Sequence, residues 1–146
     1  SVGLLGADYE IENGRYRFAR IYSGDIWSSN LRGPLAYPGM DIKQGDFLIA
    51  VDGRELRASD DINRFFEDKT GKEVLLCISE DAGGAHTREV KVVPINSGFD
   101  YLIRYFNRME DNRRKVDKLT NGRVAYIYLP DEGEAGVAAF NRYFFA

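Results

Sequence analysis

Apolar and polar residues alternate over short stretches in the first part of the chain, and this pattern predicts β-strands. Tyr16 and Phe18 alternate with Arg15 and Arg17, as in a strand with one buried face. The Asn13-Gly14 step just before them is a strong signal for a two-residue hairpin turn. We therefore predict a hairpin near the start of the chain.

Three later apolar runs predict three further strands. Residues 47–51 form a short apolar run that ends at Asp52-Gly53, which fits a buried strand followed by a tight turn. Residues 74–78 and 90–93 are similar runs, and Gly83-Gly84 lies in the loop between them. The expected fold class is mostly β with α, built as a small antiparallel barrel or sandwich.

One helix is predicted inside this β-rich region. Ser59 is a suitable N-cap residue, and the two aspartates after it suit the positive end of a helix. Ile62, Phe65 and Phe66 then share one helical face. These features predict one principal helix over residues 59–68.

A second helical pattern follows and divides the chain into three parts. Residues 1–97 are interpreted as the β-rich domain, and residues 98–120 as a connecting amphipathic helix. In residues 121–146, the apolar run 123–130 predicts a strand, and the aromatic residues after it predict the start of a helix. Because a strand and a helix fragment cannot form a domain, we interpret this third part as the incomplete beginning of a following subdomain. The stripe on the connecting helix consists of Phe99, Leu102, Ile103, Phe106, Met109, Val116 and Leu119.

Composition and charge exclude several classes of protein. Of the 146 residues, 44% are hydrophobic and 29% are charged, as in an ordinary globular domain, and no apolar run is long enough to cross a membrane. The formal net charge of -3 and the scattered basic residues argue against nucleic-acid binding. Cys77 is the only cysteine, which favours a cytoplasmic location, and a periplasmic one stays open if a signal peptide precedes Ser1. Since the chain starts at Ser1, we expect it to be a segment of a longer protein.

No set of residues predicts an active site. His86 is the only histidine, and its place beside Gly83-Gly84 favours a solvated turn over a catalytic base. Cys77 lies in a predicted strand, which favours a buried small side chain over a nucleophile. There is no cluster of metal-ligating residues and no phosphate-binding loop, so we expect no metal, no cofactor and no activity from this segment alone.

Three segments resemble a known family of proteins. Residues 37–53, with a Pro-Gly step, a Gly-Asp step and an apolar strand ending in Asp52-Gly53, resemble PDZ domains of bacterial and archaeal proteases. Residues 112–131 are similar to the junction that follows the PDZ domain in tricorn proteases, and residues 5–10 are similar to the approach to that domain. The tail-specific, C-terminal processing proteases are more distant relatives. In tricorn proteases the catalytic His precedes the PDZ domain and the nucleophilic Ser follows it, so this resemblance places both outside residues 1–146.

The resemblance implies a peptide-binding site. PDZ domains add an extended peptide to a sheet edge and hold its terminal carboxylate on backbone N–H groups of a loop. Residues 4–7 match the position of that loop, residues 7–11 that of the pairing edge, and the helix over 59–68 that of the opposite wall. The candidate residues are Leu4, Leu5, Gly6, Ala7, Tyr9, Ile11, Ile62, Phe65 and Phe66.

Two alternatives stay open. Residues 4–7 lie so near the first residue that they could instead be a frayed end, and the three candidates on the helix could be core residues. The domain would then be a structural spacer or assembly domain in an oligomeric protease, without an open groove. The partners that the resemblance implies are peptide or unfolded-protein C-termini, the rest of the parent protease and further copies in an oligomer, with no membrane or nucleic acid.

Overall fold

The computed structural model describes residues 1–120, and the strand and helix expected within 121–146 lie outside the described residues. The strands pair in the order β1-β2-β3-β5-β6, with β4 added to β3, and every pairing is antiparallel. The expected class, mostly β with α, is confirmed. The elements are β1 (Ala7–Glu12), β2 (Arg15–Ile21), η1 (Ser29–Leu31), β3 (Phe47–Val51), β4 (Arg54–Glu55), η2 (Ile62–Phe66), β5 (Val74–Ser79), β6 (Thr87–Val92) and α1 (Ser97–Thr120).

Both predicted tight turns are present. Asn13 and Gly14 have φ of 51° and 77°, and Asp52 and Gly53 have φ of 51° and 78°. Positive φ at both central residues is what a hairpin turn matching the strand twist requires, and Asn, Asp and Gly tolerate it best. The first turn joins β1 to β2, and the second joins β3 to β4.

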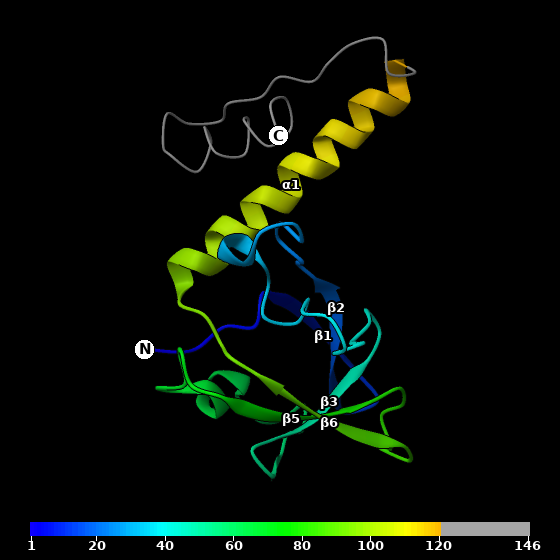
Figure 1. Cartoon of the computed structure of the whole chain (residues 1–146). Coiled ribbons are helices and arrows are strands. Elements are labelled where there is room, and N and C mark those ends of the chain that lie inside the picture. The colour runs from blue at the N-terminus through cyan, green and yellow to red at the C-terminus, as the bar shows by residue number, and fades with distance from the viewer. Residues whose placement is uncertain (121–146) are drawn as a thin grey trace.

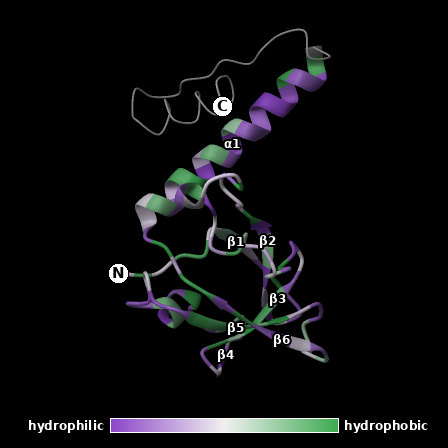
Figure 2. Cartoon of the chain, viewed as in Figure 1, coloured by the Kyte–Doolittle hydropathy of each residue, from purple (hydrophilic) through white to green (hydrophobic). Residues whose placement is uncertain are grey.

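One face of the sheet forms the core. Phe18, Leu48 and Leu76 are completely buried there, and Leu56 closes over them from the segment after β4. Figure 2 shows hydrophobic colouring most clearly along β5 and in η2, whereas the second half of α1 is mostly hydrophilic. The core therefore belongs to the sheet, and α1 is an addition at its side (Figure 1).

The helix predicted over 59–68 is shorter than expected. It is a 3-10 helix, η2, capped by Asp61, whose side chain accepts the N–H of Asn63 at 3.0 Å. Ser59 is not its cap, because Asp60 belongs to the preceding turn and accepts the N–H of Arg57 at 2.9 Å. At the other end, the C-cap Glu67 has a ψ of 129°, so the helix ends at Phe66.

Helix α1 begins at its side-chain cap Asn96, which accepts the N–H of Phe99 at 2.8 Å. The predicted stripe is buried at Ile103, Phe106 and Met109, whereas Leu119 is 85% exposed. Within residues 1–120, none of the helices combines the length and the apolar character that a membrane crossing needs.

The loop between β2 and β3 packs against α1, as Figure 1 shows for the light-blue η1. Gly24 donates its N–H to the side chain of Asn107 at 2.9 Å. A side chain at Gly24 would lie 1.8 Å from the carbonyl oxygen of Leu31, and its φ is 65°. Only glycine allows this close approach of the two sides of the loop.

Candidate functional site

A small hollow lies between β1 and η2, at the place where the sequence predicts the groove. β1 is an edge strand of the sheet. Its side away from β2 is not paired with another strand in the part of the chain described. The hollow has a volume of about 30 Å³, which is room for about one water molecule. It is lined by Leu4, Leu5, Ala7, Tyr9, Ile62 and Phe66, together with Gly3, Asn63 and Arg104.

Six of the nine predicted residues therefore meet in one place, and the other three do not. Gly6 is buried beside the hollow, with the positive φ of 66° that the predicted loop needs. Phe65 points into the core with 6% of its surface exposed, and Ile11 is half-exposed near the end of β1. Phe66 is also a core residue, whereas Ile62 is only partly buried.

The residues before β1 are held in place. Val2 pairs with Glu67, and Leu4 pairs with Ile95. The N–H of Gly3 donates to the carbonyl of Phe66 at 2.9 Å, and the N–H of Leu4 donates to that of Ile95 at 2.8 Å. The alternative of a frayed end is thus wrong, and the amide groups of Gly3 and Leu4 are already used within the chain.

Arg104, on α1, closes one end of the hollow. Its Nη2–H donates to the carbonyl of Ala7 at 2.9 Å, its Nη1–H to Asp8 at 2.5 Å and its Nε–H to Asp100 at 2.7 Å. Burial disfavours the charge of Arg104, but the hydrogen bonds to the two carboxylates outweigh it, so its pKa is raised. The side chain thus ties the first turns of α1 to the first residues of β1.

Tyr22 completes this contact between the sheet and α1. Its hydroxyl donates to Asp8 at 2.7 Å, and its ring lies 4.6 Å from the guanidinium groups of both Arg20 and Arg104. Burial alone would raise the pKa of Asp8, but the hydrogen bonds from Arg104 and Tyr22 lower it below its ordinary value of 3.8. Arg20 also pairs with Asp111 at 2.6 Å, about two turns further along α1 than Arg104.

Asp100 is the unusual member of this cluster. Only 6% of its surface is exposed, and its Oδ1 has no hydrogen-bond partner among the described residues. That oxygen lies 3.9 Å from the point where a Cβ of Gly6 would stand. A buried carboxylate oxygen therefore faces the loop in which a ligand carboxylate was expected.

The sequence pattern did not indicate Asp8, Asp100 or Arg104 as members of the site. The signal available was the i, i+4 pair of Asp100 and Arg104 next to the apolar stripe of a predicted helix. Arg113 and Arg114, further along α1, pair with Asp117 and Glu110 within the helix.

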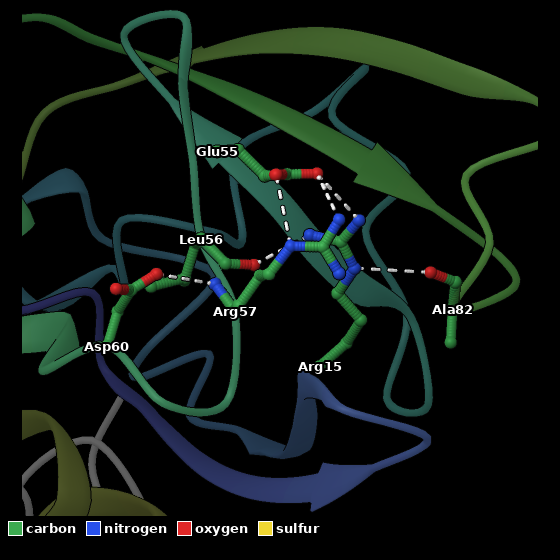
Figure 3. A network of polar contacts seen from close by, with 6 residues as sticks. All are labelled: Arg15, Glu55, Leu56, Arg57, Asp60 and Ala82. Carbon is green, nitrogen blue, oxygen red and sulfur yellow. Dashed lines mark hydrogen bonds and ion pairs between the residues drawn. The ribbon is translucent and has the colours of Figure 1, made fainter.

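Arg15, whose side chain is buried, has a structural role (Figure 3). Its guanidinium donates to the carbonyl of Leu56 at 2.8 Å, to that of Ala82 at 3.3 Å and to the carboxylate of Glu55 at 3.0 Å. The hydrogen bond from Arg15 lowers the pKa of Glu55. Arg15 thereby joins the start of β2 to two loops that are distant in sequence.

A larger hollow, of about 320 Å³, lies beside the other edge of the sheet. It is lined by residues of β6, the loop before β3 and the start of α1, among them Met40, Val92 and Phe99. The sequence pattern predicts no site there.

The two residues weighed as catalytic candidates lie apart from both hollows. His86 lies exposed in the loop before β6, and Cys77 is half-buried in β5.

Comparisons with known proteins identify the family. Residues 3–97 match the sequence model described as the tricorn protease PDZ domain. The chain belongs to the tricorn protease PDZ domain family. The resemblance stated from residues 37–53 and 112–131 is thereby confirmed, and the PDZ-like fold class with it.

Individual relatives agree with this assignment. The chain is 36% identical to the Tricorn-like protease C-terminal subunit of Sulfurisphaera tokodaii, over 98% of its own length and 16% of that protein's. It is 34% identical to the tricorn protease homolog of Saccharolobus solfataricus, over 99% of its length and 13% of that protein's. The crystal structure of the tricorn protease matches 97% of the chain and 13% of its own, with a TM-score of 0.83 and 27% identity. The chain thus spans a small part of the length of the relatives that it matches.

Proposed function

We propose that this PDZ domain recognises extended peptide segments by adding them as a strand to the free edge of β1, facing η2. The observation that carries the proposal is the position of the hollow, which lies between that edge and η2 and is lined by six residues predicted to bind peptide. Strand addition gives affinity through main-chain hydrogen bonds, and the side chains of the opposite wall give selectivity. Half-buried Ile62 is the main apolar contact that such a ligand would reach.

The family supports a role for this binding inside a larger enzyme. Its relatives are named as tricorn proteases and are much longer than this chain. We propose that the domain orients peptide substrates for a serine-type peptidase of that kind, whose catalytic residues lie elsewhere in the parent chain. Assembly of the parent into an oligomer is part of the same proposal.

The finer prediction, capture of a terminal carboxylate by residues 4–7, has less support. It needs free N–H groups at the loop, and the N–H of Leu4 already donates to Ile95. The alternative of a structural spacer is favoured by two contacts. Phe66 is covered by the chain's own residues, and Arg104 already occupies the carbonyl of Ala7. These contacts close the start of β1 and leave its later residues available for a ligand.

Calorimetric titration of the chain with acetylated, amidated peptides of alternating apolar and polar residues tests the proposal. We expect measurable binding and its loss in Ile62→Lys, because the charged group would stand in the groove. Ile42→Lys is the matched control, since Ile42 is also half-buried against the same core but lies outside the hollow. Peptides that bind neither the parent chain nor the control would refute strand addition and favour the spacer.

A further inference from the structure

We infer that the groove admits alanine and excludes large side chains at the ligand position that faces the hollow between β1 and η2. The inference rests on the proposed strand addition at β1 and names the class of peptide that this edge takes. Successive side chains of an extended ligand point to opposite faces, so every second residue points toward the floor of the groove. The hollow lies beside the start of β1, where one of these residues would stand.

The volume of the hollow limits what that residue can be. It offers about 30 Å³, the room of about one water molecule, and a methyl group is of similar size. The branched side chain of leucine and the ring of phenylalanine do not fit unless a wall moves. The hollow beside β6 offers about 320 Å³, so the lack of space is a property of this groove and not of the whole surface.

The walls are held in place because they belong to the core of the sheet. Leu5 and Phe66 are each 3% exposed, and with Ala7 they are part of the main core cluster. The ring of Tyr9 packs against that of Phe18, with the ring centroids 5.6 Å apart. Enlarging the hollow would disturb this packing, and forcing extra carbon atoms into a close-packed core is unfavourable.

The chemistry of the lining favours a methyl group over no side chain at all. Apart from Asn63 and Arg104, the side chains that line the hollow carry apolar groups or, for Tyr9, an aromatic ring. Removing a methyl group from water into such surroundings is favourable, so alanine binds better than glycine. Arg104 does not swing away to make room, because it donates to both Asp8 and Asp100.

Peptides of alternating threonine and alanine, acetylated and amidated, test the inference on the unmodified chain. The host peptide has three alanines, and each of three further peptides has one alanine replaced by leucine. When the ligand pairs antiparallel with β1, its C-terminal end lies beside the start of β1. We expect leucine at the alanine nearest the C-terminus to weaken binding by at least about tenfold in calorimetric titration. Leucine at either of the other two positions should change the affinity by less than about threefold.

The pattern across the four peptides separates the inference from the proposed function. If the host binds, an equal response to leucine at all three positions overturns the inference and leaves strand addition intact. A loss confined to one of the other two positions overturns it as well. Binding by none of the four peptides refutes the proposed function, and the inference with it.

The variant Leu4→Ala assigns the selectivity to the hollow. Leu4 is half-buried and lines the hollow, so its truncation makes room for the leucine of the ligand. We expect the tenfold loss to fall to about threefold or less. Ile42→Ala is the matched control, since Ile42 is half-buried against the same core but lies outside the hollow, and it should keep the full loss.

An equal loss in Leu4→Ala and Ile42→Ala contradicts the role of the hollow. Circular dichroism confirms that each variant is folded. If Leu4→Ala is not folded, Ile62→Ala enlarges the hollow from the opposite wall and takes its place. The comparison of the four peptides on the unmodified chain stands in either case.

Discussion

Replacing Arg104 by Met removes the contact that ties α1 to β1. Methionine keeps much of the apolar stem of the side chain and loses the charge and all three hydrogen bonds. Asp100, whose side chain is 9% exposed, would be left as an unpaired buried carboxylate. Removing one partner of a buried ion pair costs about 3–5 kcal/mol. The Asp8 side chain is 45% exposed, so water screens its share of the loss.

These terms lead to an expected loss of about 2–3 kcal/mol in the free energy of unfolding. For a chain of this size that corresponds to a fall in Tm of about 5–10 °C. Far-UV circular dichroism is the suitable probe, since the only tryptophan, Trp27, is 88% exposed and its fluorescence would change little on unfolding. Arg108→Met is the control, because Arg108 is an exposed arginine on the same helix. It should cost less than about 0.5 kcal/mol.

A double-mutant cycle decides which carboxylate matters more. The coupling of Arg104 with Asp100 should be about 1.5–3 kcal/mol, as for a hydrogen bond to a charged and buried group. The coupling of Arg104 with half-exposed Asp8 should stay below about 1 kcal/mol. Equal Tm values for Arg104→Met and Arg108→Met, or a larger coupling with Asp8, would refute this account of the cluster.

Three further predictions concern stability. Arg15→Met should lower the free energy of unfolding by about 2–3 kcal/mol in urea titrations, because the carbonyl of buried Leu56 loses its charged donor. Gly24→Ala should cost more than about 2 kcal/mol because its Cβ would strike a carbonyl oxygen, whereas Gly14→Ala, with open space at a similar φ, should cost about 1 kcal/mol. Since the pKa of Asp8 is lowered in the folded chain, its stabilisation is present above the ordinary value of 3.8 and is lost as the pH falls through the lower folded value. Acid titrations of Asp8→Asn should therefore show a shallower loss of stability below about pH 4 than the parent chain.

The fold was predictable where local sequence determines local structure. Asn13-Gly14 and Asp52-Gly53 specify positive φ, and the apolar run 47–51 specifies a buried strand, so these elements followed from single segments. The helix over 59–68 was overestimated, because Asp60 is used by the preceding turn, Asp61 becomes the cap, and Glu67 already leaves the helical conformation. Propensity alone does not reveal such competition for a capping residue.

The site was predictable only in part. The apolar lining of the hollow followed from the family resemblance, which carries the approximate positions of a loop, a strand and a facing wall. The polar residues that close it did not, since Asp8 and Arg104 are 96 residues apart in the sequence. Neither periodicity nor local charge spacing indicates a pair between distant elements. The unpartnered oxygen of Asp100 appears only once α1 is placed beside Gly6.

Amide hydrogen exchange along β1, measured by NMR with and without a saturating amidated peptide, tests the central claim most directly. Strand addition places new hydrogen bonds on the amide groups of β1 that do not face β2. The account predicts that these amides exchange more slowly with peptide, while amides of β6, at the opposite edge of the sheet, are unchanged. Unchanged exchange along β1 under saturating peptide, or protection confined to β6, would contradict it.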